Sequence, residues 1–185
     1  MGYLDNASYH VYNRGAHRQS FFKTSFELEL CLKIFERFAD KYHVQLRAYC
    51  LMPNHYHLLL HQLQGGSISS FLRTSFSAYT QSFNAREHHS GTIFQGSPKS
   101  KLIESDEQMQ TTILYIHYNP VASNLVNKPQ DWIYSDFSCW AGLIPFRFHR
   151  SGLRDELFEG RKGFIKAAAE YPSTAPKLVE LGLDE

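Results

Sequence analysis

The sequence has few cysteines, no long apolar run and almost no net charge, and each of the first two absences excludes a class of protein. Its three cysteines, Cys31, Cys50 and Cys139, are far apart and show no C-x-x-C spacing. This argues against a disulfide framework or a zinc knuckle and favours reduced core residues of a cytoplasmic protein. No run approaches the roughly 20 apolar residues of a membrane span, and the first ten residues do not form a signal peptide. We therefore expect a cytoplasmic protein with no membrane partner.

The net charge of +1 says little about partners, but the charges are unevenly distributed. Residues 1–102 contain 11 Lys and Arg against 6 Asp and Glu, together with 8 of the 10 histidines. Residues 103–185 contain 8 Lys and Arg against 12 Asp and Glu. The first part of the chain is therefore the part suited to an anionic partner, although its cationic surplus is modest for a nucleic-acid-binding protein.

The abundance of aromatic residues excludes a disordered chain. With 14 Phe, 11 Tyr and 2 Trp among 185 residues, the chain can bury a real core. Residue patterns predict strands at 9–13, 44–51, 55–61 and 99–103, with a tight turn at 52–54 that makes the middle two strands a hairpin.

Three helices are predicted between and after these strands. The first is expected to begin after an N-cap at Ser25, with an apolar stripe at Phe26, Leu30, Ile34, Phe35 and Phe38. The second follows the glycines at 65–66, and its expected stripe is Ile68, Phe71, Leu72, Phe76 and Tyr79. The third is expected to follow an N-cap at Ser105 and to end near Asn119, because Pro120 disfavours helix at the residue before it.

The order strand, helix, hairpin, helix, strand, helix predicts an α+β fold of the ferredoxin-like or RRM-like kind. In such a fold an antiparallel sheet carries its helices mainly on one face. We place this domain at residues 1–150. Residues 151–185, where the composition turns charged and then small, are interpreted as a C-terminal helical extension.

The segment LMPNHYHLLLH, residues 51–61, has histidines at alternate positions. The strand period of two places His55, His57 and His61 on one face and Tyr56 on the other. Neighbouring imidazoles on one face can bind one cation. The same pattern suits two histidines on a polar sheet face, so it does not decide the matter alone. We interpret His61, on the same face but four residues beyond His57, as a neighbour of the site only.

A second candidate pair lies on the third helix. Tyr115 and Asn119 are four residues apart and so share one helical face. A tyrosine hydroxyl, with an ordinary pKa of about 10, becomes a useful nucleophile when a metal polarises the electrophile. An amide oxygen of Asn119 suits magnesium or manganese. Tyr115 could equally be a core residue, because its neighbours in the helix are apolar.

Together the two pairs would supply three metal ligands and a nucleophile. Attack of Tyr115 on a phosphodiester would give a phosphotyrosine and release a 3′-hydroxyl end, conserving the bond energy for rejoining. Two alternatives stay open. One is a catalytically silent DNA- or RNA-binding module on the same sheet. The other is a metallohydrolase that uses His55 and His57 with an activated water.

Four segments in this order resemble a known family: YHVYNRGAHRQSFF, AYCLMPNHYHLLL, FQGSPKS and YIHYNPVASNLV. They are similar to the REP-associated tyrosine transposases, within the insertion sequence 200-like group of single-tyrosine HUH transposases. The resemblance extends from about Tyr9 to Gly142, and the segment WIYSDFSCWAG also fits it. It implies an RRM-like sheet and a DNA strand transferase acting on single-stranded DNA beside a hairpin of a palindromic repeat.

The resemblance also implies roles for individual residues. His55 and His57 would bind a divalent metal, Mg²⁺ or Mn²⁺, and Asn119 would complete the metal site. Tyr115 would become 5′-phosphotyrosyl. Related insertion-sequence transposases act as dimers with exchanged tyrosine helices, so a homodimer is one of the states that the resemblance allows.

Four cations are the candidate DNA-binding residues. Arg14 and Arg18 flank the turn after the first strand, and Lys99 and Lys101 lie on the last one. Arg14 and Lys99 also match family motif positions, whereas Arg18 and Lys101 fit equally well as solvated surface charges. The chain departs from the family pattern at Ser97 and Pro98, where family members have Arg and an aromatic, and at Ser123, where they have Arg. Fewer cations would weaken phosphate contacts.

Overall fold

The computed structural model describes residues 2–148 and 152–171. The chain divides into two compact units. The first unit consists of residues 1–47 and 51–102, and the second of residues 48–50 and 103–185. Residue 151 and residues 172–185 of the predicted C-terminal extension lie outside the described residues. Its described part contains the helices α5 (Gly152–Phe158) and α6 (Arg161–Glu170).

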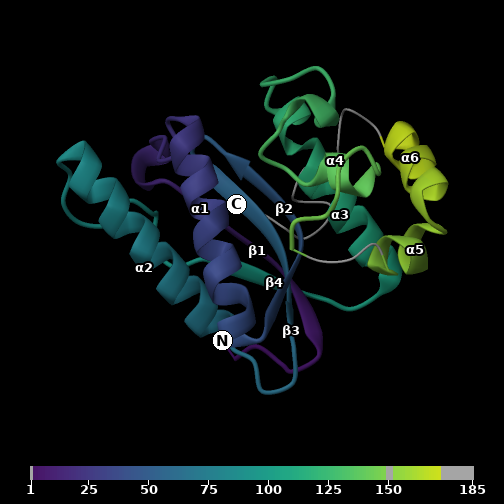
Figure 1. The fold of residues 1–185 in the computed structure, drawn as a ribbon, viewed down its shortest axis with the longest axis horizontal. Coiled ribbons are helices and arrows are strands. Elements are labelled where there is room, and N and C mark those ends of the chain that lie inside the picture. Colours follow the sequence, from purple (N-terminus) through teal and green to yellow (C-terminus); the bar gives the residue numbers. More distant parts are fainter. Residues whose placement is uncertain (1, 149–151, 172–185) are drawn as a thin grey trace. The chain divides into compact units, whose positions relative to one another are not determined.

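A four-stranded antiparallel sheet forms the centre of the fold (Figure 1). Its strands are β1 (Ala7–Arg14), β2 (Val44–Met52), β3 (His55–Gln62) and β4 (Lys99–Ile103), in the order β2-β3-β1-β4. The connecting helices are α1 (Ser25–Ala39) and α2 (Ile68–Glu87). The predicted α+β class is thus confirmed, and the strand order with two intervening helices is that of a ferredoxin-like fold.

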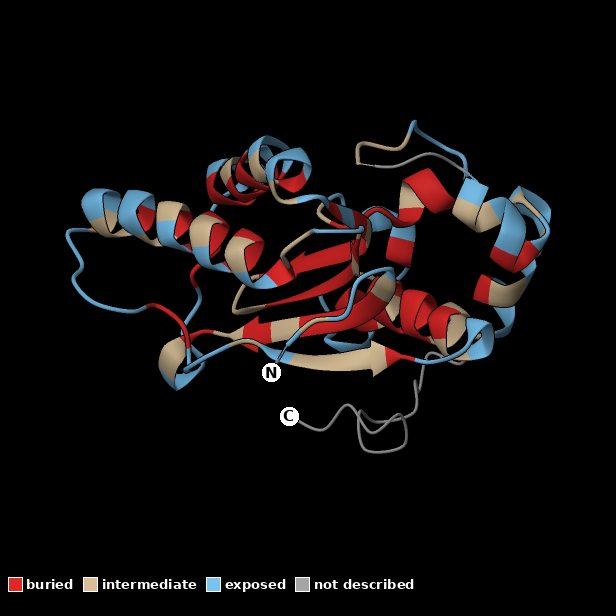
Figure 2. Cartoon of the chain, turned by 90° about the horizontal axis from the view of Figure 1, so that it is seen from below, coloured by how far each residue is buried: buried red, intermediate tan, exposed pale blue. Residues whose placement is uncertain are grey.

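The helices α1 and α2 cover one face of the sheet in the first unit (Figure 2). On that face β3 contributes Tyr56, Leu58 and Leu60, all fully buried. The Tyr56 ring stacks on Phe76 of α2 with centroids 4.4 Å apart. The apolar stripe predicted for α2 is confirmed, since all five of its residues are buried. The opposite face of β3 therefore carries the alternate residues, among them the histidines.

The first helix differs from its prediction at the N-terminus. Its N-cap is Thr24 and not Ser25, and Phe26 is 61% exposed where a core position was expected. The buried residue in this turn is Glu27, which forms a capping box with Thr24. Phe26 instead lies beneath the Arg86 guanidinium, with 5.0 Å between the guanidinium carbon and the ring centroid. The carboxylate takes the inward position because the backbone donors at the helix start need it.

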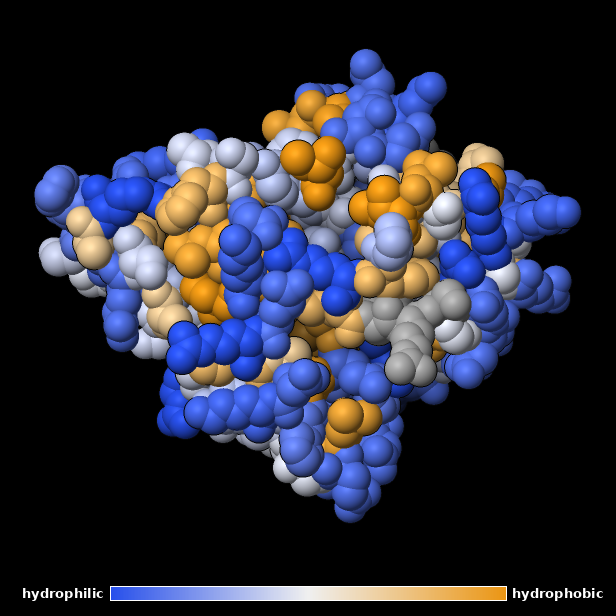
Figure 3. Space-filling view, viewed as in Figure 1, coloured by the Kyte–Doolittle hydropathy of each residue, from blue (hydrophilic) through white to orange (hydrophobic). Residues whose placement is uncertain are grey.

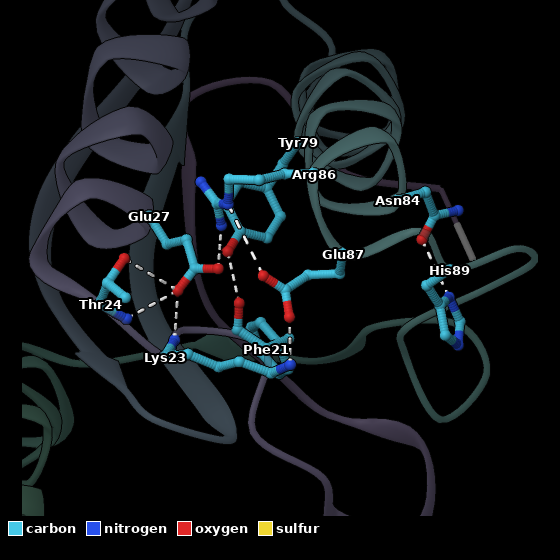
Figure 4. A network of polar contacts seen from close by, with 9 residues as sticks. All are labelled: Phe21, Lys23, Thr24, Glu27, Tyr79, Asn84, Arg86, Glu87 and His89. Atoms are coloured by element: carbon cyan, nitrogen blue, oxygen red, sulfur yellow. Dashed lines mark hydrogen bonds and ion pairs between the residues drawn. The ribbon is translucent and has the colours of Figure 1, made fainter.

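Glu27 also links the start of α1 to the end of α2 (Figure 4). Its carboxylate accepts hydrogen bonds from the backbone nitrogens of Lys23 and Thr24, the latter at 2.7 Å. The other carboxylate oxygen is paired with the guanidinium of Arg86 near the end of α2. A buried carboxylate needs such partners to offset its lost hydration, so this contact fixes how α1 lies on α2.

The helix α3 (Asp106–Ala122) belongs to the second unit and continues past the predicted end. Ser105 is its N-cap, as predicted, and its hydroxyl accepts from the backbone nitrogen of Gln108. The helix was expected to end near Asn119, but it includes Pro120 in its last turn. Proline has no N–H to donate to the carbonyl four residues earlier and its ring crowds that carbonyl, yet the helix continues for two residues beyond it. The Ser123 nitrogen bonds to the Asn119 carbonyl at 2.9 Å and closes the turn.

A buried carboxylate organises the core of the second unit. Asp136, which precedes the short helix α4 (Phe137–Trp140), accepts from the Tyr49 nitrogen at 2.8 Å and from His117 Nε2 at 2.9 Å. Its second oxygen accepts from Trp140 Nε1 at 3.0 Å. The Trp140 ring in turn packs on Phe164 of α6, with centroids 5.6 Å apart. This carboxylate therefore ties together α3, α4 and the middle of β2.

The surface drawn in Figure 3 is mostly hydrophilic, with small separate apolar patches. Single exposed apolar side chains of this kind are normal on folded proteins. Among the described residues the large ones are Leu4, Phe26, Leu125, Ile133, Leu143, Ile144 and Ile165. No helix in the described part of the chain has the length and apolar character needed to cross a bilayer.

Candidate active site

The histidine pair lies on the sheet face that α1 and α2 leave uncovered in the first unit. His55 and His57 have ring centroids 5.2 Å apart and nearly perpendicular planes, at 87°. In the register of β1 with β3, His55 is opposite Arg14 and His57 is opposite Tyr12. The prediction that both histidines share a face is confirmed. At this distance the two imidazoles can reach one cation.

His57 is held by a third histidine that the sequence analysis did not single out. The Nε2 atom of His10 lies 3.0 Å from Nδ1 of His57, and both side chains are buried. The two rings are stacked with centroids 5.2 Å apart, and Tyr12 stacks on His10 at the same separation. Burial, followed by the charge of Lys101, lowers the pKa of His10 to about 3.

His55 is held in a similar way by the residue that precedes it. Its Nδ1 lies 2.7 Å from Oδ1 of Asn54. The amide nitrogen of Asn54 donates to the Arg18 carbonyl at 3.3 Å, which fixes the amide so that the oxygen faces the imidazole. His55 therefore donates through Nδ1. The predicted turn at 52–54 thus places Asn54 beside the first histidine of the pair.

The donors of the pair fit a divalent metal. With Nδ1 engaged in each ring, Nε2 is the nitrogen with which His55 and His57 would bind a cation, the arrangement usual for metal-bound histidine. The described residues contain no group of three or more His, Cys, Asp or Glu side chains able to hold a metal ion. A third protein ligand would therefore be of another type, such as an amide.

The tyrosine pair lies on α3 in the second unit. Tyr115 and Asn119 are 7% and 8% exposed. The amide nitrogen of Asn119 donates to the Tyr115 carbonyl at 2.9 Å, which leaves the amide oxygen directed away from the helix backbone. The structure brings Tyr115 and Asn119 together on one face of α3, as predicted. The histidine pair belongs to the first unit and the tyrosine pair to the second.

The four predicted DNA-binding cations all belong to the first unit. Arg14 donates through Nε to Gln95 at 2.8 Å, and Lys99 lies over the Tyr12 ring with Nζ 5.9 Å from its centroid. Arg18 is exposed beside the turn that leads to His55. The charge of Lys101 acts on His10. Arg14, Lys99 and Lys101 thus lie near the histidine face of the sheet.

A cavity of about 750 Å³ lies in the first unit away from the histidine pair. Its walls include Phe76 of α2, Phe94, Arg73 and the loop residues Ser97 and Pro98. Neither His55 nor His57 lines it, so it is not the site of the proposed chemistry. It does contain the two neighbouring positions at which the sequence departs from the family pattern. Those departures therefore change the wall of a cavity in the first unit.

We expect acid to destabilise the fold through His61, the third histidine of β3. Burial, followed by the charge of Arg47, lowers the pKa of His61 to about 4 from its usual 6.5. Between pH 6.5 and 4 the unfolded chain binds a proton here that the folded chain does not, so the free energy of unfolding falls as pH falls. Because His61 is only half-buried, we expect about 0.5 kcal/mol per pH unit, below the limit of about 1.4.

Urea unfolding between pH 6.5 and 5 measures this effect. The buried His10 contributes with the same sign, since its pKa is lowered as well. His61→Gln keeps a polar group beside Ser8, which lies 3.1 Å from His61 Nδ1, and removes the titration. The variant should show a flatter dependence of the unfolding midpoint on pH. An equal slope in variant and wild type would contradict the prediction.

Comparison with known proteins places these residues in a family. The model of the family described as "Transposase IS200 like" matches residues 3–119, which include both histidines, Tyr115 and Asn119. By class the protein is therefore a transposase. It belongs to the IS200-like transposase family, as the resemblance in the sequence implied. No protein among the curated sequences matches it.

One solved structure, with a TM-score above 0.5, shares the fold of this chain. A REP-associated tyrosine transposase bound to a REP hairpin has a TM-score of 0.64 at 18% identity, over 78% of this chain and 86% of that one. A putative transposase from Deinococcus radiodurans R1 has a TM-score of 0.45 at 20% identity, over 60% of this chain and 88% of that one. A bacterial tRNA(His) guanylyltransferase-like protein in complex with GTP has a TM-score of 0.49 at 8% identity, over 68% and 67%.

Proposed function

We propose that this chain is a metal-dependent DNA strand transferase that cleaves single-stranded DNA beside a hairpin through a 5′-phosphotyrosine on Tyr115. The observation that carries the proposal is the extent of the family match. It covers residues 3–119 and so includes the residues of both pairs. In this function the histidine pair would supply two metal ligands, and the tyrosine pair would supply the nucleophile and an amide ligand.

Tyr115 is the nucleophile in this proposal. Its Oη attacks the phosphorus of a phosphodiester, the bond from phosphorus to the 3′-oxygen breaks, and the phenolic proton leaves to solvent. The released strand end takes up a proton and becomes a 3′-hydroxyl. The phosphotyrosine keeps the energy of the broken bond, so a 3′-hydroxyl can later attack it and rejoin the DNA. No ATP is needed for that reversal.

His55, His57 and Asn119 would hold the metal, Mg²⁺ or Mn²⁺. The imidazoles would bind through Nε2 and the amide through Oδ1, because Nδ1 of each histidine and Nδ2 of Asn119 already have hydrogen-bond partners. A bound divalent cation neutralises charge on a phosphate oxygen and makes the phosphorus easier to attack. The protein's own contribution is to fix these donors before the metal arrives.

Hairpin DNA is the proposed partner. The solved REP-associated transposase of the same fold is bound to a REP hairpin, and this likeness supports the choice of substrate. Arg14, Arg18, Lys99 and Lys101 would contact phosphates near the histidine face. Such contacts position the strand without reading its sequence. Because salt dependence grows with the number of phosphates contacted, four such contacts predict binding that weakens less steeply with salt than that of proteins making about six to ten.

Strand labelling tests the proposal. A hairpin from a palindromic repeat beside the gene, with a single-stranded flank, is labelled at its 5′ or its 3′ end and incubated with protein and Mn²⁺. A 5′-phosphotyrosine keeps the 3′ part of the strand on the protein. The 3′ label should therefore move to the protein band on a denaturing gel, and the 5′ label should appear on a shorter free strand. Chelation of the metal should abolish both products.

Two other outcomes identify the alternatives. Cleavage that frees both labels would indicate a metallohydrolase that uses His55 and His57 with an activated water. Tight binding of the hairpin with no cleavage in any divalent metal would indicate a catalytically silent hairpin-binding protein. In either case the phosphotyrosine step is wrong.

A further inference from the structure

The histidine pair has a supporting residue on a different strand. His10 belongs to β1, whereas His57 belongs to β3, and the register places Leu59 opposite His10. His10 and His57 are therefore diagonal neighbours, a relation that long side chains can bridge. Their nitrogens are 3.0 Å apart and their rings are stacked. Burial keeps water from taking the place of either partner, since His10 and His57 are 0% and 1% exposed.

A contact between two imidazole nitrogens contains a single proton, which can be on either ring. If His10 donates, neutral His57 carries its own proton on Nε2, and that nitrogen cannot bind a cation. If His57 donates through Nδ1, its Nε2 keeps the lone pair. Only the second arrangement makes His57 a metal ligand. His10 must then accept through Nε2.

His55 shows the same arrangement with another acceptor. Asn54 offers only an oxygen to His55 Nδ1, because its amide nitrogen is bonded to the Arg18 carbonyl. The two histidines, on alternate positions of one strand, thus receive their acceptors from different parts of the first unit. The acceptor of His55 comes from the hairpin turn and that of His57 from the neighbouring strand.

We propose that His10 is a positioning residue that holds His57 in the Nδ1–H tautomer and so prepares its Nε2 for the metal. The inference rests on the proposed function, because it assigns His57 to the metal site. It adds a residue of β1 to the site. Supporting acceptors of this kind contribute about 10- to 100-fold to metal affinity in proteins.

Three substitutions separate positioning from packing. In His10→Gln the amide oxygen can reach the place of Nε2, so an acceptor is retained. In His10→Leu the volume is roughly kept and the acceptor is lost. In His10→Asn the amide is polar but too short to reach His57. Titration with MnCl₂ alone, followed by calorimetry, should show affinity about 10- to 100-fold weaker for Leu and Asn and within about threefold of wild type for Gln.

Nitrogen-15 NMR of the histidines measures the tautomer without metal or DNA. The His57 signals, assigned by their loss in His57→Ala, should show Nδ1–H in wild type and in His10→Gln, and a mixture in His10→Leu. Wild-type His57 protonated on Nε2 would overturn the inference. A folded His10→Leu variant in which His57 keeps both its Nδ1–H tautomer and its affinity for Mn²⁺ would also overturn the inference.

The two proposals fail in different ways. Wild type that binds no Mn²⁺ and forms no DNA adduct contradicts the proposed function, yet the tautomer of His57 in wild type still decides the role of His10. Wild type that forms the adduct while His57 is protonated on Nε2 supports the function and overturns the inference.

Discussion

Tyr115→Phe is expected to form no covalent adduct with hairpin DNA and to lose strand cleavage by at least about 1,000-fold, the size of loss seen when a catalytic nucleophile is removed. The change deletes a single oxygen. Phenylalanine keeps the ring that packs in the second unit, where Tyr115 is 7% exposed, so the fold should persist. The measurement is the transfer of a 3′ label to protein on a denaturing gel, with hairpin binding measured separately by gel shift.

Tyr118→Phe is the matched control. Tyr118 lies on the same helix, and its hydroxyl donates to the Ala168 carbonyl of α6. Its loss should cost stability of about 1 kcal/mol and leave the adduct unchanged. Cleavage that persists in Tyr115→Phe would contradict the nucleophile assignment and support the metallohydrolase. If the adduct is lost in Tyr118→Phe and kept in Tyr115→Phe, the nucleophile is Tyr118 and not Tyr115.

The same substitutions show whether Tyr115 acts in its own subunit. Tyr115→Phe lacks the proposed nucleophile, and His57→Ala lacks one proposed metal ligand. A mixture of the two recovers adduct formation when Tyr115 reaches the histidines of a partner in a homodimer. No recovery, with each variant folded, indicates that each subunit uses its own tyrosine. Restored activity would appear on the His57→Ala chain, which a size difference between the two chains makes visible.

Much of the histidine site could be predicted from local sequence, because a strand alternates its faces with a period of two. That rule placed His55 and His57 together and Tyr56 on the helix side. The acceptor of His57 could not be predicted in the same way. His10 is 47 residues away, and only the pairing of β1 with β3 brings it into reach. A histidine within the predicted strand 9–13 was the available signal.

Helix boundaries show where local rules compete. Periodicity placed Phe26 in the core, but the start of α1 needed a carboxylate for its unpaired backbone donors, and Glu27 took the inward position. The rule that a helix ends before proline failed at Pro120, which lies inside the last turn of α3. The helix nevertheless places Tyr115 and Asn119 on one face, since both come before the proline.

Asp136→Leu is expected to lower the free energy of unfolding by at least about 3 kcal/mol. The substitution leaves three buried donors without their acceptor: the Tyr49 nitrogen, His117 Nε2 and Trp140 Nε1. Each buried donor that loses its partner costs about 1–3 kcal/mol. The urea midpoint should therefore fall by more than about 1 M, given a denaturant slope of about 1–3 kcal/mol/M. A domain at the low end of the ordinary range of stability, about 5 kcal/mol, would be close to unfolding.

Two further variants make the cause specific. Asp136→Asn keeps one oxygen acceptor and turns an amide donor toward the remaining partners, so its loss should lie between those of wild type and Asp136→Leu. Asp131→Asn removes a charge from an exposed site and should stay within about 0.5 kcal/mol of wild type. Equal midpoints for Asp136→Leu and Asp131→Asn would show that the carboxylate contributes nothing.

Because His117 lies on α3 between Tyr115 and Asn119, a partly unfolded second unit would also lose the DNA adduct. Adduct formation must therefore be compared at temperatures where each variant is folded.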